Sequence, residues 1–555
     1  MVWWMTGWMA GPGNLPLWQR LFALDQSLGQ RVGSILGLAL LIAGITATLL
    51  CLLNWPRLLR PLASVMLIIT AFSAHYMWQY GVVIDPTMLA NALHTDVREV
   101  RDLLSPSLAI SLGFLAAPPL WWLWRRPLTY RPAGPQLARN VGGAALGLLL
   151  ALVVVLVSYQ GLATLMRNDK SLRYMVSPLN AVYAAGVVAA EQGPRKIRAL
   201  QPVGEDARLG ASYFQQTRPP LLVLVVGETA RADRFGLNGY GRDTTPLLTR
   251  WRDAGDLLNF DQVSSCGTNT LVSVPCLFSP LTRGTGGNAE PDRENLLDVL
   301  QRAGLAVLWL DNQSGCKGVC DRVPHASTRD APMPVPGASL CEGSDCFDEA
   351  LLAGLDDRLA ALDPQRLQRG AVVVLHQMGS HGPAYFRRAP QARKRFQPEC
   401  ASTTLSDCTS EQLDNAYDNS IAYTDQFLDQ VLHWVEKKSV QGTHDSGLIY
   451  VSDHGESLGE RGLYLHGVPY ALAPAQQTHV PMVTWLSPGL QQRTGVAMPC
   501  LRARVHTPIS HDHFFHSVLG LMDVNTNAYQ PGLDAMAPCA TQRVQAAGFK
   551  PSSAG

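Results

Sequence analysis

Four long uncharged segments constrain the fold of this chain more than any other feature of its sequence. They cover residues 33–53, 61–83, 106–124 and 141–160, and no comparable segment follows residue 161. Each is close to the roughly 20 residues that an α-helix needs to cross a hydrocarbon core. Buried helices of a large soluble protein are the alternative, but the crowding of all four runs at one end favours a transmembrane domain over residues 1–160.

Arginine residues in the connecting loops predict the orientation of these spans. The first loop, NWPRLLRP, and the third loop, RRPLTYRPAGPQLARN, contain arginines and no acidic residue, whereas the second loop mixes both charges. An excess of arginine marks the cytoplasmic side of a membrane. The first and third loops are therefore expected inside, and everything after the last span outside.

The same count of spans places the N-terminus outside. Residues 2–18 are apolar but short, and glycine and proline interrupt them. They lack the basic start of a signal peptide. We expect a truncated first span or an interfacial segment anchored by tryptophans.

Composition agrees with a membrane protein that carries a soluble portion. The chain is 47% hydrophobic and only 16% charged, against about 25% charged in soluble domains. Its formal net charge of +1 argues against a nucleic-acid-binding surface.

The cysteines point to an oxidising compartment. Of the eleven cysteines, Cys51 lies in a predicted span and the other ten lie within 266–539. An even set in an outward-facing domain predicts disulfides. Zinc-binding cysteines of a cytosolic domain are the alternative, which the loop charges disfavour. Short spacings suggest the pairs Cys266–Cys276, Cys316–Cys320, Cys341–Cys346 and Cys400–Cys408, leaving Cys500–Cys539.

Residues 219–540 have the pattern of an α/β domain, preceded by a linker or bridging helix over 161–218. Apolar runs expected of strands that are buried on both faces alternate with helix-like segments. These runs are residues 221–226, 306–311, 371–376 and 447–453. The alternation predicts a mostly parallel sheet covered by helices.

In such a sheet, ligands bind beyond the carboxyl ends of the strands. Glu228, Asp453 and His454 follow two of the predicted strands, and Asp311 and His376 end two others. Two carboxylates and an imidazole suit Zn²⁺.

The segment SSCGTNTLVSVPCLFS offers a nucleophile for such a zinc site in Thr268. Coordination to a metal would lower the pKa of its hydroxyl. The plainer interpretation is that Thr268 caps a helix. The two interpretations are compatible, since a helix N-terminus also favours an incoming phosphate.

Other histidines are candidates for phosphate or second-metal binding. His376 and His381 lie in HQMGSHGP, and His466 lies in YLHG. Each alone is as readily a surface residue. The run HTPISHDHFFH lacks a nearby acidic cluster, and we interpret it as a solvated or packed segment.

Four motifs together resemble a known family. GETARADRFGLNGY, SCGTNTLVSVPCLFS, HQMGSHGPAYF and YVSDHGESLGERGLYLHG closely resemble the motifs of lipid A phosphoethanolamine transferases, including the mobile colistin-resistance enzymes. The resemblance extends from the membrane segments to about residue 525. It implies an inner-membrane enzyme of Gram-negative bacteria with an alkaline-phosphatase-like α/β/α sandwich in the periplasm.

The resemblance also implies roles for individual residues. Thr268 would be the nucleophile, and zinc would be held by Glu228, Thr268, Asp453 and His454. A second zinc during turnover stays open. The residues implied near the substrate are His381, His466, His376, Ser314, Lys317, Asn91, Thr95 and Glu99. The last three are spaced to share one helix face, where they would meet an ethanolamine ammonium group.

The implied reaction moves phosphoethanolamine from phosphatidylethanolamine to a lipid A phosphate through a covalent threonine intermediate. A less negative surface would bind cationic peptides less well and give polymyxin resistance. We expect a monomer that contacts membrane lipids and no nucleic acid. Another envelope acceptor, such as an inner-core sugar or a glucan, is the main alternative.

Three further alternatives fit less well. A sulfatase needs a C-x-P-x-R setting that neither Cys266 nor Cys276 has. A phosphoglycerol transferase is closer in chemistry, but the cysteine-flanked nucleophile segment favours phosphoethanolamine. A binding protein with an inactive site is disfavoured by the complete set of candidate ligands. The sequence departs from the family at residues 2–18, where a full first span is usual, and at Asn269, where a small residue is common.

Overall fold

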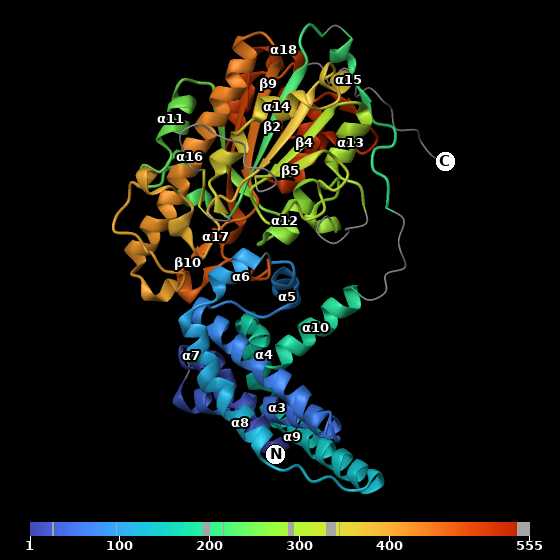
Figure 1. The fold of residues 1–555 in the computed structure, drawn as a ribbon, viewed down its shortest axis with the longest axis vertical. Coiled ribbons are helices and arrows are strands. Elements are labelled where there is room, and N and C mark those ends of the chain that lie inside the picture. The colour runs from blue at the N-terminus through green and yellow to red at the C-terminus, as the bar shows by residue number, and fades with distance from the viewer. Residues whose placement is uncertain are drawn as a thin grey trace. The chain divides into compact units, whose positions relative to one another are not determined.

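The computed structural model describes residues 1–24, 27–95, 97–192, 200–214, 216–286, 293–328, 340–342 and 345–540. It divides into two compact units, which we describe separately. The first comprises Met1–Arg195 with Thr403–Asp407 and Gly459–Tyr464, and the second comprises the remainder. Figure 1 shows that the first unit is helical and that the second contains a large sheet.

The first unit is built from ten α-helices within the described residues. They are α1 (Val2–Ala10), α2 (Leu15–Phe22), α3 (Leu28–Leu52), α4 (Leu59–Tyr80), α5 (Pro86–Leu93), α6 (Val97–Leu103), α7 (Pro106–Leu115), α8 (Ala117–Arg125), α9 (Ala133–Asn168) and α10 (Leu179–Gln192).

Three of these helices, α3, α4 and α9, are long and apolar enough to cross a membrane. The pair α7 and α8 would make a fourth span, bent by 40°. The bend falls at Ala116, just before the two prolines of α8, Pro118 and Pro119, because proline removes a backbone donor and clashes with the preceding turn. All four predicted uncharged segments therefore fall on apolar helices. The segment 161–218, predicted as a linker, holds the end of α9 and the whole of α10.

Residues 2–18 fold as part of the first unit. Glycine and proline break them into α1, a short 3₁₀ turn (Pro12–Asn14) and the start of α2. Met5, Met9 and Leu17 are fully buried, and they belong to the two hydrophobic clusters of this unit. The segment is thus a packed broken helix, because its apolar side chains bury against α3, α4 and α9 rather than forming one continuous span.

The second unit is organised around an eight-stranded mixed sheet. Its strand order is β13 (Ile509–Ser510), β3 (Leu257–Ser264), β12 (His479–Leu486), β9 (Asp445–Ser452), β2 (Pro220–Gly227), β8 (Ala371–His376), β4 (Ala306–Asp311) and β5 (His325–Ser327). Neighbours from β9 to β5 are parallel, whereas β12 is antiparallel to both β3 and β9. The four predicted strands are β2, β4, β8 and β9, and they lie side by side. Their carboxyl ends consequently meet at one edge.

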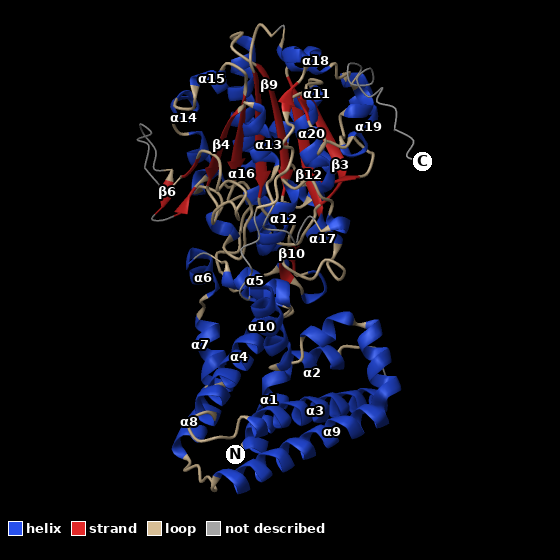
Figure 2. Ribbon diagram, turned by 90° about the vertical axis from the view of Figure 1, so that its right-hand side faces the viewer, coloured by secondary structure: helices blue, strands red, loops and turns tan. Residues whose placement is uncertain are grey.

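Helices cover both faces of this sheet (Figures 1 and 2). The helices of the unit are α11 (Pro246–Asp253), α12 (Thr270–Leu277), α13 (Leu296–Ala303), α14 (Leu355–Ala360), α15 (Pro364–Leu367), α16 (Ser410–Val440), α17 (Ala475–Thr478), α18 (Pro488–Thr494), α19 (Met498–Arg504) and α20 (Phe514–Leu521). Side chains of β2, β8 and β9 form one core with those of α12, α13 and α20. Every residue of β2, β4, β8 and β9 is buried, as their continuous apolar runs predict.

Short strand pairs and five disulfides complete the second unit. The remaining strands are β1 (Arg208–Leu209), β14 (Val524–Asn525), β6 (Cys341–Glu342), β7 (Asp345–Cys346), β10 (Ser457–Leu458) and β11 (Tyr464–Leu465). The disulfides join Cys266–Cys276, Cys316–Cys320, Cys341–Cys346, Cys400–Cys408 and Cys500–Cys539, as the spacings suggested. Cys51 is the free cysteine of the described chain.

Candidate active site

Glu228, Asp453 and His454 converge at the carboxyl edge of the sheet. Glu228 follows β2, and the other two follow β9, the parallel neighbour of β2. All three side chains are fully buried. His454 Nε2 lies 3.3 Å from Glu228 Oε1 and 3.3 Å from Asp453 Oδ2. The sequence predicted that these three residues lie together, and the structure confirms it.

The donor atoms of this cluster suit a divalent cation. His454 Nδ1 bonds the carbonyl of Gly455 at 2.9 Å, so Nδ1 carries the proton and Nε2 faces the carboxylates. Asp453 Oδ1 accepts the backbone N–H groups of Thr229 and His454, whereas its buried Oδ2 has no hydrogen-bond partner in the described chain. A buried carboxylate oxygen without a donor needs a cation. One imidazole nitrogen and two carboxylates form a ligand set that zinc uses.

The electrostatics of the cluster lead to the same conclusion. Burial opposes the charge on His454, but the carboxylates of Asp453 and Glu228 overcome it and raise the pKa of the imidazole. Burial and the nearby Glu228 charge raise the pKa of Asp453. Burial also disfavours the Glu228 anion, yet the His454 hydrogen bond and charge hold the Glu228 pKa well below its usual range. Without a metal, a proton on His454 balances the two carboxylates.

Thr270, rather than Thr268, presents its hydroxyl to this cluster. Thr270 Oγ1 donates to Glu228 Oε2 at 3.0 Å and lies 3.4 Å from His454 Nε2. Thr270 is the first residue of α12, which Asn269 caps by accepting the N–H of Val272. The helix thus begins one residue later than a Thr268 cap would require.

The Thr268 hydroxyl is directed elsewhere. It donates to the carbonyl of Val468 at 2.8 Å, and the Thr268 carbonyl accepts the N–H of Gly467. The geometry therefore corrects the choice of Thr268 from the sequence. In its place, Thr270 brings a hydroxyl as a fourth polar group to Glu228, Asp453 and His454.

Two more histidines lie beside the cluster. The ring of His466 is 4.4 Å from that of His454 and 5.4 Å from that of His381, measured between centroids. His466 Nδ1 contacts the buried carboxylate of Glu456 at 2.9 Å. His381 and His466, both candidates for substrate binding from the sequence, thus lie next to each other beside His454.

His376 takes a different position. Its Nδ1 contacts Asp311 Oδ2 at 3.0 Å, and the indole N–H of Trp309 donates to the same oxygen. The Asp311 carboxylate outweighs burial and raises the pKa of His376. His376 and Asp311 form a buried pair beneath the site, and the structure gives His376 no hydrogen bond to the Glu228 cluster among the described residues.

Ser314 and Lys317 connect to the cluster through Gln313. Lys317 Nζ donates to Ser314 Oγ at 2.6 Å, and Gln313 Nε2 donates to Glu228 Oε2 at 2.8 Å. Gln313 was missed by the sequence reasoning, although it follows directly after β4 and Asn312. A complete reading of polar residues beyond each strand end would have included it.

The three candidates of the first unit do not share one helix. Asn91 lies in α5 and Glu99 in α6, and Thr95 lies between them, where its hydroxyl donates to the carbonyl of Asn91. The predicted common helix face is therefore wrong, because α5 ends at Leu93 and α6 begins only at Val97. The side chain of Glu99 lies outside the described residues.

Comparisons with known proteins identify relatives of both units. A family profile described as phosphoethanolamine transferase EptA/EptB matches residues 41–192, and a sulfatase profile matches residues 220–524. The chain is 39% identical over 503 residues to phosphoethanolamine transferase EptA of Salmonella typhimurium, covering 89% of this chain and 88% of that protein. It is 36% identical over 512 residues to phosphatidylethanolamine transferase Mcr-1 of Escherichia coli, covering 90% of each.

A solved structure matches the whole chain. It is the integral membrane lipooligosaccharide phosphoethanolamine transferase A (EptA) from Neisseria meningitidis, with a TM-score of 0.89 and 33% identity over 97% of this chain and 98% of that chain. The resemblance stated from the motifs is thereby confirmed, as is the predicted class of a helical membrane portion joined to an alkaline-phosphatase-like α/β domain. This chain belongs to the phosphoethanolamine transferase family.

Proposed function

We propose that this chain transfers phosphoethanolamine from phosphatidylethanolamine to a phosphate of lipid A, through a covalent phosphoethanolamine adduct on Thr270. The observation that carries the proposal is the buried Thr270 hydroxyl, 3.0 Å from Glu228 Oε2 and 3.4 Å from His454 Nε2. A hydroxyl is a weak nucleophile unless a base or metal activates it. Here the carboxylate of Glu228 is placed to accept the proton, and Glu228, Asp453 and His454 together could hold a metal beside the hydroxyl.

Zinc is the metal that we propose for this site, held by Glu228, Thr270, Asp453 and His454. When bound, it would act as a Lewis acid that lowers the hydroxyl pKa and offsets charge on phosphoryl oxygens. Beside this site, His381 and His466 lie close enough together to act on one group. They would bind the phosphate directly or hold a second zinc.

The first half-reaction balances around Thr270. Its Oγ forms a bond to the phosphorus of phosphatidylethanolamine as the bond to the glycerol oxygen breaks. The proton of the hydroxyl passes by way of Glu228 Oε2, its hydrogen-bond acceptor, to the leaving diacylglycerol oxygen, so Glu228 ends the step as a carboxylate. The Lys317 ammonium would offset negative charge as it develops.

The second half-reaction reverses these roles. A phosphate oxygen of lipid A attacks the phosphorus of the adduct, the bond to Thr270 Oγ breaks, and the threonine regains its proton. Lipid A gains an ammonium group, so the outer surface becomes less negative and binds cationic peptides less well. Polymyxin resistance is the expected phenotype.

The chain would lie in the inner membrane of a Gram-negative cell, with its second unit in the periplasm. Three observations support this location. Arginines crowd the loops that precede α4 and follow α8, which marks those loops as cytoplasmic. Ten cysteines form five disulfides, as in an oxidising compartment. The Neisseria meningitidis relative is an integral membrane protein that acts on lipooligosaccharide. We propose a monomer.

The test is mass spectrometry of lipid A from a polymyxin-sensitive host that expresses the chain. Thr270→Val and Thr268→Val are matched variants, because each removes one hydroxyl and keeps the side-chain shape. The wild type and T268V should add phosphoethanolamine to lipid A, and T270V should not. Unmodified lipid A beside a modified inner-core sugar or glucan would move the proposal to that acceptor. Equal modification by T270V would reject Thr270 as nucleophile.

A further inference from the structure

The histidine-rich run that the sequence analysis set aside contains one buried bridging residue. His511 begins a short 3₁₀ turn, His511–His513, and only 2% of its surface is exposed. Its Nδ1 accepts the backbone N–H of Cys266 at 3.2 Å. Its Nε2 lies 3.0 Å from the carbonyl of Ser452. Because an amide donates and a carbonyl accepts, His511 is neutral with its proton on Nε2.

These two bonds connect the segments that carry the reacting groups. Cys266 lies four residues before Thr270, on the segment that leads into α12. Ser452 is the last residue of β9 and directly precedes Asp453 and His454. His511 thus joins the segment that leads to Thr270 with the segment that leads to Asp453 and His454. Both of its ring bonds are to backbone atoms and not to the side chains of the cluster.

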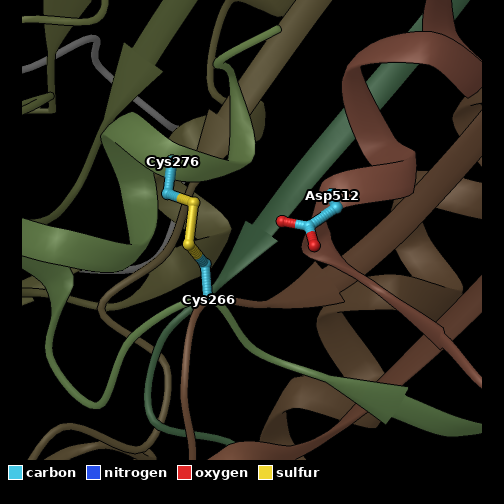
Figure 3. Close-up of side chains that lie close together, drawn as sticks. All are labelled: Cys266, Cys276 and Asp512. Atoms are coloured by element: carbon cyan, nitrogen blue, oxygen red, sulfur yellow. A yellow bond between two sulfur atoms is a disulfide. The ribbon is translucent and has the colours of Figure 1, made fainter. Parts of the chain in front are cut away.

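Two further contacts connect this turn and the start of α20 to the chain that follows α12. Asp512 Oδ1 accepts the N–H of Arg283, beyond the end of the helix, at 2.8 Å. Figure 3 shows the Asp512 carboxylate beside the Cys266–Cys276 disulfide, which closes the segment. The ring of Phe514 packs edge-on against Phe278, the C-cap of α12, with 5.5 Å between centroids.

We propose that His511 is a positioning residue, which fixes Thr270 relative to Asp453 and His454. The inference rests on the proposed function and adds a residue to it. The Thr270 hydroxyl is useful only within hydrogen-bond reach of its activating groups, and a displacement of about 1 Å costs roughly a hundredfold in rate. Backbone bonds at both ends of a rigid imidazole prevent that displacement.

The experiment uses the full chain in detergent with phosphatidylethanolamine. His511→Met removes both polar atoms at similar volume, and His511→Gln keeps one acceptor and one donor in their place. His516→Met is the matched control, because His516 is equally buried and its Nδ1 accepts the N–H of Gln530, which belongs to neither of the segments that His511 joins. The rate of adduct formation on Thr270 is followed by intact-protein mass. Hydrogen exchange of the Cys266 amide is measured on metal-free protein.

H511M should form the adduct about 10- to 100-fold more slowly at unchanged KM, as when a residue behind a ligand is lost, and its Cys266 amide should exchange faster. H511Q should recover most of the rate, and H516M should match the wild type in both measurements. The proposal is overturned if H511M keeps the wild-type rate, or if H516M slows equally, since that would report general loss of stability.

Two further outcomes keep the tests separate. If H511M does not fold, the wild-type protein still decides, because rapid exchange of its Cys266 amide would disprove the bond to His511. If the wild type forms no adduct, the proposed function fails, while the exchange comparison of H511Q, H511M and H516M still shows whether His511 holds Cys266.

Discussion

His466 owes its orientation to a single carboxylate. Glu456 is fully buried, and its two oxygens contact His466 Nδ1 at 2.9 Å and the Tyr385 hydroxyl at 2.7 Å. A carboxylate behind an imidazole fixes which nitrogen carries the proton and raises the basicity of the other. The Nε2 lone pair of His466 therefore remains available on the side of His454 and His381.

Glu456→Gln should slow adduct formation by about 10- to 100-fold. The amide oxygen still accepts from His466 Nδ1, so the ring keeps its orientation and only the negative charge is lost. Tyr385→Phe, which removes the bond to the other carboxylate oxygen, should have a smaller effect. Single-turnover rates of the two variants with phosphatidylethanolamine check the prediction, and an unchanged rate in E456Q would contradict it.

At the level of single residues, the sequence predicted the ligands better than the nucleophile. Glu228, Asp453 and His454 could be found because each follows a recognisable buried strand, and parallel neighbours end at the same edge. Thr268 and Thr270 could not be distinguished in this way. They are two residues apart, but Thr268 precedes the extended N-cap residue and Thr270 lies in the first turn of the helix, so their side chains leave the backbone in different directions. The position of the cap, at Asn269, decides which hydroxyl faces the side chains of Glu228 and His454.

Among the larger elements, α12 depends on its disulfide for position. Cys266–Cys276 closes ten residues around the helix, and Cys500–Cys539 closes 39 residues elsewhere. Loop entropy predicts stabilisation of about 3 kcal/mol for the short loop and about 4 kcal/mol for the long one. The element that carries Thr270 is nevertheless held by the weaker constraint.

Paired serine variants separate stability from function. C500S/C539S should lose more unfolding free energy yet keep its rate of adduct formation. C266S/C276S should lose less unfolding free energy but a larger share of its rate, because the nucleophile helix is then free to shift. Thermal unfolding and single-turnover kinetics on the same samples make the comparison. A rate that simply follows stability in both pairs would refute the positioning role of the disulfide.

The turn beside α12 also predicts a pH dependence of stability. Burial, with a smaller effect of His454, lowers the pKa of His511 from 6.5 to about 4. Protonation would put an N–H at Nδ1, so that one donor faces another at the Cys266 amide. Because the pKa of His511 is lower in the folded state, neutral His511 contributes its full stabilisation above pH 6.5. That contribution is lost as the pH falls toward 4.

Metal-free wild-type protein should therefore lose about 2 kcal/mol more unfolding free energy than H511Q between pH 7 and pH 5. The Gln side chain does not titrate, and His516 remains in both proteins, so the difference isolates His511. Thermal unfolding at the two pH values provides the measurement. Parallel pH curves for the two proteins would show that His511 does not control this transition.

The sheet illustrates what patterns along the chain can predict about elements. The strands β2, β4, β8 and β9 were predicted because strands buried on both faces have continuous apolar runs. The edge-side strand β3 (LLNFDQVS) mixes buried and exposed positions, and β12 (HVPMVTWL) joins it by antiparallel pairing. Neither pattern distinguishes a strand from a loop by itself, because the pairing that buries these residues comes from distant parts of the chain.

On the scale of the whole molecule, hydropathy predicted the membrane-spanning helices but not the packing around them. Length and absence of charge sufficed for α3, α4, α9 and the bent pair α7–α8, since the bilayer imposes both. The broken segment of residues 2–18 was harder to interpret. Its burial depends on contacts with α3, α4 and α9, and such contacts leave no periodic signal in a short apolar stretch.

Loop charge makes a prediction for the entire chain. A β-lactamase fused after residue 130, in the loop with Arg125, Arg126 and Arg131, should leave cells sensitive to ampicillin. A fusion after residue 212, beyond α10, should make them resistant, because the enzyme protects cells only from the periplasm. A fusion in the loop after α3 is the control and should match the first. The reversed pattern would place the five disulfides in a reducing compartment and the catalytic unit away from its lipid A acceptor. The fusion experiment therefore tests the proposed orientation, the compartment of the disulfides and access to the proposed acceptor together.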